Sequence, residues 1–280
     1  MTRAKVIARA RSVKHAGWLA RKRIWSRVEP AVAPGIDAAL RVYTRALPPP
    51  MPSRDPVAVE RAAERIFCLW TGHNAMSRNR LRAMARIRRL NEPDLDVVLV
   101  TPDNLGEWIV PGHPLHAAYD DLALIHRSDY LRTYLLHHHG GGYTDVKAAQ
   151  HSWRPLFDGL NRDQDAWLLG YQEPSYRFVA PAPPGLHRRL VMHHARLLGN
   201  GAYIVRPRTP FTREWLAEAE RRLDVWQDDL RLRPGAVYGA VGYPVPFYGL
   251  LGEIFHPLCL QHHGRLRQDE RITPQLQDYK

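Results

Sequence analysis

Apolar runs of strand length alternate along this chain with longer segments of helical periodicity. The runs at residues 66–70 and 95–101 are almost wholly apolar, which predicts two strands buried on both faces of a sheet. Between them, apolar residues recur at helical spacing after Ser77, which can cap the helix that this spacing predicts. The inner face of this helix would carry Leu81, Met84, Ile87 and Leu90.

The rest of the chain continues this alternation less regularly. We expect further helices at residues 102–109, 114–119, 122–139, 186–198, 210–230 and 247–262. We expect further strands at residues 143–147, 167–170 and 202–205, with a turn at residues 199–201. Because strands alternate with helices, the chain is predicted to form an α/β fold, with a mostly parallel, Rossmann-like sheet flanked by helices.

Charged residues interrupt the apolar pattern of the central segment, residues 128–147. Asp129 and Arg132 are three positions apart in the expected helix, so they share one face. They lie among leucines and tyrosines, and unpaired charges are rarely buried. Three glycines, at positions 140–142, would end the helix, because glycine adopts left-handed cap conformations without steric cost.

The short strand expected after these glycines ends with charged residues. Successive side chains of a strand point to opposite faces, so Tyr143, Asp145 and Lys147 would share one face. An acid and a base at the carboxyl end of a strand lie where open α/β sheets usually bind ligands. We therefore predict a functional site here; the alternative is a surface salt bridge followed by a glycine turn.

Two other residues are candidates for the same site. Trp70 ends the first apolar run, where an aromatic ring can stack on a base or a sugar. Asn200 lies between two glycines and could reach a diphosphate or a hydroxyl group. The alternatives are a core tryptophan and an ordinary turn residue.

Composition and charge limit the class of protein. The 280 residues carry a formal net charge of +12, with nine Lys or Arg in residues 1–30. We expect this basic N-terminal arm either to lie on an anionic membrane surface or to remain a solvated arm. A proline-rich linker within residues 31–56 would lead into one folded domain at residues 57–280.

Other features point to a reducing compartment and exclude several kinds of site. Cys68 and Cys259 lie in apolar runs and are expected to be buried thiols, which favours a cytoplasmic location, peripheral on the inner face of the membrane if the arm binds it. His137–His139 are consecutive in a helix, so their side chains diverge and cannot converge on one metal ion. The chain has no CxxC pair, P-loop or GxSxG elbow.

Four blocks of sequence together resemble the sugar transferases that carry the DXD sugar-binding motif, of the bacterial capsular-polysaccharide-synthesis type. They are RIFCLWTGHNAMSRNRL, LIHRSDYLRTYLLHHHGGGYTDVK, GNGAYIVRPRTPF and YPVPFYGLLGEIFHPL, within residues 64–260. The second block also resembles glucosylating bacterial toxins of the same nucleotide-sugar fold. The resemblance implies a GT-A type fold and transfer of a hexose, most simply from a UDP-sugar, to a polysaccharide or glycolipid acceptor, with retention of anomeric configuration.

The same resemblance implies roles for the site residues. Trp70 would stack on the nucleotide base, and Asp129 and Arg132 would hold hydroxyl groups of the donor sugar. Tyr143 and Asp145 would begin the acidic motif, and Asn200 would help to bind the donor. Residues from Tyr243 to Glu253 are expected to close over the donor or to meet the acceptor.

The chain departs from the family pattern at Lys147. The family has a second aspartate there that binds Mn²⁺ or Mg²⁺ on the diphosphate, which leaves Asp145 as the only candidate metal ligand. A lysine cannot ligate a cation, but its ammonium group can lie against the diphosphate. We therefore expect Lys147 to replace the metal ion; the alternative is a degenerate, inactive site.

Two further classes of function stay open from the residues alone. One is a protein that binds a sugar nucleotide without turning it over. The other is a basic nucleic-acid-binding protein, which the net charge permits. No nucleic-acid partner is expected, because the basic excess lies in the N-terminal arm and no nucleic-acid-binding module is visible.

Overall fold

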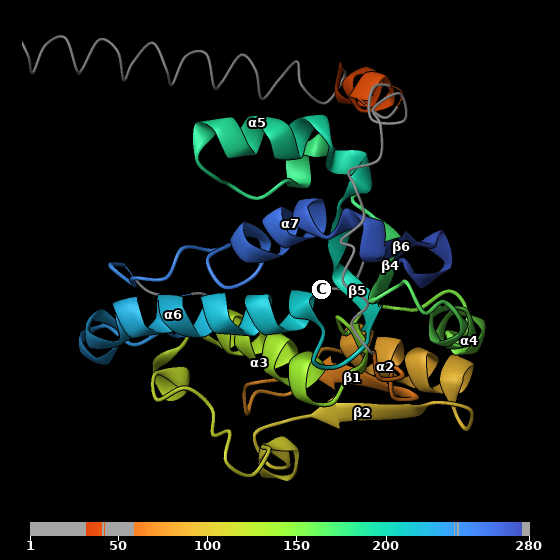
Figure 1. The fold of residues 1–280 in the computed structure, drawn as a ribbon. Helices are drawn as coiled ribbons and strands as arrows, with labels where there is room; N and C mark the ends of the chain where they lie inside the picture. Colours follow the sequence, from red (N-terminus) through yellow and green to blue (C-terminus); the bar gives the residue numbers. More distant parts are fainter. Residues whose placement is uncertain (1–31, 41, 43–58, 238, 240, 276–280) are drawn as a thin grey trace, which may run out of the picture. The chain divides into compact units, whose positions relative to one another are not determined.

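The computed structural model describes residues 32–40, 42, 59–237, 239 and 241–275 (Figure 1). The chain divides into two compact units, Met1–Leu47 and Pro48–Lys280. In the first unit residues 32–40 form a helix, inside the stretch that we expected to be a linker. The basic arm at residues 1–30, the proline run and the domain boundary expected at residue 57 lie outside the described residues.

The second unit is built on one sheet of six strands in the order β2-β1-β3-β5-β4-β6. The strands are β1 Arg65–Leu69, β2 Asp96–Val100, β3 Gly141–Thr144, β4 Leu168–Gln172, β5 Leu198–Val205 and β6 Leu266–Gln268. β1 is parallel to β2 and β3, and β4 is parallel to β6, whereas β5 runs antiparallel to both β3 and β4. Five strands therefore point the same way and β5 alone is reversed.

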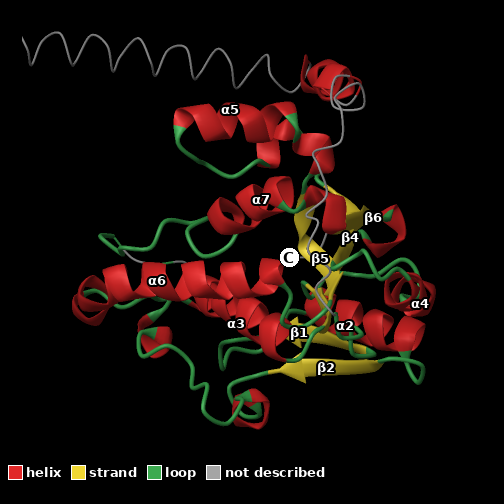
Figure 2. Ribbon diagram, in the orientation of Figure 1, coloured by secondary structure: helices red, strands yellow, loops and turns green. Residues whose placement is uncertain are grey.

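Helices cover both faces of this sheet (Figure 2). The covering helices are α2 Arg78–Asn91, α3 Leu124–His138, α4 Arg154–Arg162, α6 Pro210–Leu232 and α7 Gly252–Gln261, and α5 Pro184–Met192 packs against α7. Within β1, Phe67 and Leu69 pack in the large core cluster that includes residues of α3, α6 and α7. Ile66 and Cys68 point to the other face, toward α4 and α2. This double burial explains the unbroken apolar run of the strand and confirms the expected α/β class, with a mostly parallel sheet flanked by helices.

Several local expectations are confirmed. Ser77 caps α2 by accepting a hydrogen bond from the backbone N–H of Arg80. Both cysteines are buried and free. Along α6 the inward-facing residues Phe211, Trp215, Leu216, Ala219 and Leu223 are buried. Within the described ranges, every helix is too short or too polar to cross a bilayer.

Other expectations are wrong. Leu81 is 56% exposed, because the buried face of α2 is formed by Ala83, Met84 and Ile87. The helices expected at residues 102–109 and 114–119 are only single 3₁₀ turns, Leu105–Trp108 and Tyr119–Asp121. The helix expected at residues 186–198 ends with α5 at Met192, and the one expected at residues 247–262 begins only at Gly252.

The turn expected at residues 199–201 is instead the start of strand β5. A side chain on Gly199 would place its Cβ 2.0 Å from a ring carbon of Tyr171 on the neighbouring strand β4. The glycine is therefore needed for the close approach of a tyrosine, and not for a turn.

The topology brings four chain segments to one edge of the sheet. The parallel strands β1, β3 and β4 end there, so Trp70, Asp145 and Glu173 follow them at that edge. Because β5 is reversed, its first residues, including Asn200, lie at the same edge.

The Gly199→Ala substitution tests this account of the glycine. We expect it to lower the free energy of unfolding by about 1–3 kcal/mol, because overpacking displaces the Tyr171 ring. Gly159→Ala is the matched control: its Cβ would meet no atom within 4 Å, and it lies in helix α4. There alanine should stabilise by about 0.5–1 kcal/mol. Denaturant unfolding measures both changes, and equal stability of the two variants would contradict the account.

Candidate functional site

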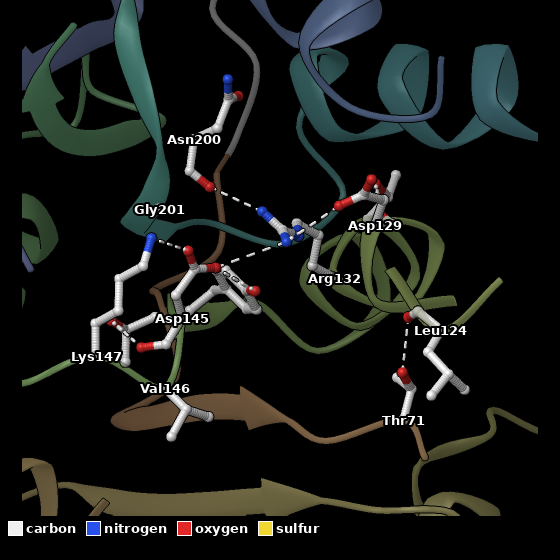
Figure 3. Close-up of polar contacts among 12 residues, drawn as sticks. Thr71, Leu124, Asp129, Arg132, Asp145, Val146, Lys147, Asn200 and Gly201 are labelled. Carbon is white, nitrogen blue, oxygen red and sulfur yellow. Dashed lines mark hydrogen bonds and ion pairs between the residues drawn. The ribbon is translucent and has the colours of Figure 1, made fainter. Parts of the chain in front are cut away.

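Arg132 lies at the centre of a buried cluster of charged side chains (Figure 3). Its Nη2 atom is 3.1 Å from Oδ1 of Asp129, one turn earlier on α3, and 3.7 Å from Oδ1 of Asp145. Its Nη1 atom donates a 2.8 Å hydrogen bond to the backbone carbonyl of Asn200 on β5. The guanidinium carbon lies 4.3 Å from the centre of the Tyr143 ring, which is a cation–π contact. One side chain thus joins α3, the end of β3 and the start of β5.

Asp145 connects Arg132 to Lys147. Its Oδ1 atom accepts a 2.8 Å hydrogen bond from the hydroxyl of Tyr143, and its Oδ2 atom lies 2.8 Å from Nζ of Lys147. Strand β3 ends at Thr144, so the expectation that Tyr143, Asp145 and Lys147 share a face through strand alternation is wrong. The backbone turns after Thr144, and the three polar groups meet through direct hydrogen bonds instead.

The cluster runs from the protein interior toward the solvent. The side chains of Asp129 and Arg132 are 4% and 7% exposed, whereas those of Lys147 and Asp145 are 15% and 24% exposed. A ligand therefore has its easiest access to Asp145 and Lys147, and Asp129 and Arg132 form the inner end.

The pKa values of the two carboxyl groups of the cluster are shifted in opposite directions. Burial raises the pKa of Asp129 to about 7, although the Arg132 guanidinium favours its charged form. Burial acts in the same sense on Asp145, but Lys147 and Arg132 together hold its pKa below the usual range. At neutral pH Asp145 is therefore a carboxylate, and Asp129 can exchange a proton.

The donor set does not fit a divalent metal ion. Both oxygens of Asp145 are engaged by protein groups, and the Lys147 ammonium lies where it would repel a cation bound to that carboxylate. Within the described residues, no group of three His, Cys, Asp or Glu side chains could hold a metal ion. The geometry instead offers a fixed positive charge beside Asp145.

Trp70 stands at the same sheet edge but is not part of the charged cluster. It is half-buried, and its indole N–H donates a 2.6 Å hydrogen bond to the backbone carbonyl of Asn74 in the following loop. The stacking of Trp70 on a base stays a prediction.

Asn200 contributes its backbone to the cluster and its side chain to a second group of residues. Its carbonyl accepts from Arg132, and its Nδ2 atom lies 3.1 Å from Nε2 of His256 on α7. The Nε2 atom of His256 also lies 3.3 Å from Oε2 of the buried Glu173, which follows β4. Sequence reasoning missed Glu173 and His256; the signal for Glu173 was an acid directly after a strand at the ligand-binding edge.

The segment expected to close over the donor is fixed to the start of α3. The Tyr243 hydroxyl accepts a 3.0 Å hydrogen bond from the backbone N–H of Ala123 and lies 3.0 Å from Nδ1 of His126. Glu253 forms a 3.0 Å ion pair with Arg222 of α6 and is not part of the charged cluster. Phe247, between them in sequence, is 58% exposed and leaves an apolar side chain at the surface of this segment.

No protein-family model matches the sequence, and no curated protein is significantly similar to it. Among solved structures, the chain is similar to "PaToxG Glycosyltransferase", with 13% identity, a TM-score of 0.44, and coverage of 86% of this chain and 78% of that chain. A likeness at this level does not establish a function, and the resemblance to the DXD sugar transferases stays a prediction.

The raised pKa of Asp129 predicts a specific titration. Its folded pKa of about 7 exceeds the ordinary aspartate pKa of 3.8, so between these pH values the folded state binds more protons than the unfolded state. The contribution of Asp129 to the free energy of unfolding therefore falls as the pH rises from about 4 to about 7 and is constant above. Side-chain carboxyl ¹³C shifts should show one aspartate titrating near pH 7, and Asp129→Asn should remove that signal. A titration below pH 5 for Asp129 would contradict the assignment.

Proposed function

We propose that this chain is a glycosyltransferase that moves a hexose from a nucleotide sugar, in the simplest case a UDP-sugar, to a polysaccharide or glycolipid acceptor. The observation that carries the proposal is the convergence of Asp129 and Arg132 from α3 with Asp145 and Lys147 from the end of β3. Buried carboxylates and cations that share hydrogen bonds are costly unless they serve a ligand or a fixed architecture. Here the cluster reaches solvent at the ligand-binding edge of an α/β sheet.

The cluster offers both kinds of group that a sugar diphosphate requires. The carboxylates of Asp129 and Asp145 would accept hydrogen bonds from hydroxyl groups of the sugar and the ribose, which fixes the donor for attack. Tyr143, which donates to Asp145 and stacks under Arg132, would keep the acceptor lone pairs of the carboxylate correctly aimed. Trp70 would stack on the base.

Lys147 would supply the charge that the leaving group needs. Departure of a nucleoside diphosphate builds negative charge on a phosphate oxygen, and a fixed cation in a partly buried site stabilises that charge without reorganisation. An ammonium group carries three N–H donors, so it can hold Asp145 and a phosphate oxygen at once. Retention of anomeric configuration belongs to this proposal, as does an arm at residues 1–30 that holds the enzyme on an anionic membrane surface near a glycolipid acceptor.

The Lys147→Ala substitution tests this mechanism. Turnover of UDP-sugars is measured as release of UDP, with and without EDTA. The wild-type enzyme should be equally active in both conditions, and Lys147→Ala should lose about a hundredfold or more in turnover, as when a positioned electrostatic donor is removed. Arg82→Ala is the control, since it removes an exposed positive charge from α2.

Two outcomes would contradict the proposal. Loss of wild-type activity in EDTA and its recovery with Mn²⁺ would assign the diphosphate charge to a metal ion and not to Lys147. Tight binding of UDP-sugars with no release of UDP, in the presence or absence of metal, would show a binding protein without turnover.

A further inference from the structure

A second buried polar group lies beside the charged cluster. Glu173 follows β4 and His256 lies in the middle of α7, and their Oε2 and Nε2 atoms are 3.3 Å apart. The side chains are 4% and 0% exposed. An acid and an imidazole placed so deeply are expensive to bury, so they need a compensating role.

The hydrogen bonds of His256 fix its protonation pattern. Its Nδ1 atom accepts a 3.0 Å hydrogen bond from the backbone N–H of Ala180, so Nδ1 carries no proton. The single proton of the neutral ring is therefore on Nε2, facing Glu173 and the side-chain amide of Asn200. Both ring nitrogens are engaged by protein groups, which excludes a role as a proton relay and leaves a role in holding its neighbours.

The neighbour that His256 holds has an unused polar atom. One end of the Asn200 amide lies 3.1 Å from Nε2 of His256, and the Oδ1 atom at the other end is buried without a hydrogen-bond partner. Because Nε2 carries the ring proton, the end of the amide that faces it must be the oxygen, which accepts from it. The NH₂ group then occupies the unpartnered position, where it can donate to a ligand. A buried polar atom without a partner is costly, and a ligand group can satisfy it.

Asn200 also links this group to the charged cluster. Its carbonyl accepts from Arg132, while its side chain points away from Arg132 (Figure 3) and lies beside His256 of α7. The first residue of α7 is close: a Cβ on Gly252 would lie 3.6 Å from Nδ2 of Asn200. Helix α7 therefore begins within van der Waals distance of the Asn200 side chain.

We propose that Glu173 and His256 are positioning residues of the donor site, which hold the Asn200 amide so that its free end meets a phosphate oxygen or a hydroxyl group of the nucleotide sugar. The inference rests on the proposed function and adds α7 to the donor site. Glu173 orients the imidazole, the imidazole orients the amide, and the amide touches the ligand.

A double-mutant cycle between His256 and Asn200 tests the proposal in the full chain. His256→Gln and Asn200→Ala should each weaken binding of UDP-glucose about tenfold, the size expected for one lost buried hydrogen bond. If His256 acts through Asn200, the double variant should bind no more weakly than Asn200→Ala alone. Binding is measured by calorimetry, and thermal unfolding confirms that each variant is folded. An equal loss with UDP alone would assign the contact to the diphosphate or the ribose, and a loss with UDP-glucose only would assign it to a hydroxyl group of the sugar.

Two results would overturn the proposal: unchanged binding in a folded His256→Gln variant, or losses that multiply in the double variant. Glu173→Gln provides a milder second variant, because its amide oxygen can still accept from His256, and it should bind nearly as tightly as the wild type.

A measurement without ligand separates this inference from the proposed function. The side-chain ¹⁵NH₂ signals of Asn200, identified by their loss in Asn200→Asp, should shift and exchange faster with solvent in His256→Gln. If wild-type protein bound no UDP-glucose but showed this change, the proposed function would fail and the positioning would stand. Signals that do not respond to His256→Gln would overturn the positioning.

Discussion

The site depends on one buried guanidinium group shared between two carboxyl groups. Arg132 contacts Asp129 on its own helix and Asp145 beyond β3, and it donates to the backbone of β5. Removing such a cation would leave buried acids uncompensated. The contacts that arrange the site also join α3 to the ends of β3 and β5, in addition to the apolar packing of the core. Burial and the shared cation also give the two acids different pKa values. Asp145 stays ionised, whereas the pKa of Asp129 lies near neutrality.

The reversed direction of β5 makes this sharing possible. The carboxyl ends of parallel strands lie at one edge of the sheet, and the amino end of an antiparallel strand lies at the same edge. The carbonyl of Asn200 can therefore reach Arg132, and the backbone N–H of Asp145 donates a 2.8 Å hydrogen bond to the carbonyl of Gly201. A fixed lysine next to Asp145 then places positive charge where the sheet edge opens to solvent.

Local sequence patterns were sufficient to predict those parts of the fold that depend on residues close together in the sequence. The spacing of Asp129 and Arg132 predicted a shared helix face, and the apolar run at β1 predicted a strand buried on both sides. The parts that failed depend on distant residues. The glycines around Asn200 indicated a turn, but the Tyr171 ring of another strand requires Gly199 in β5. Glu173 and His256 are 83 residues apart in sequence, and no local pattern joins them.

Binding of UDP-glucose to Arg132→Gln in the presence of EDTA, measured by calorimetry, tests the central claim most directly. The variant should stay folded, because Asp129 can take up a proton when its partner is removed. Arg89→Gln, which changes an exposed arginine of α2, is the control. We predict that the wild type and the control bind without metal, and that Arg132→Gln loses at least about tenfold in affinity, as for a lost charge-assisted hydrogen bond. Wild-type affinity in a folded Arg132→Gln variant would contradict the account.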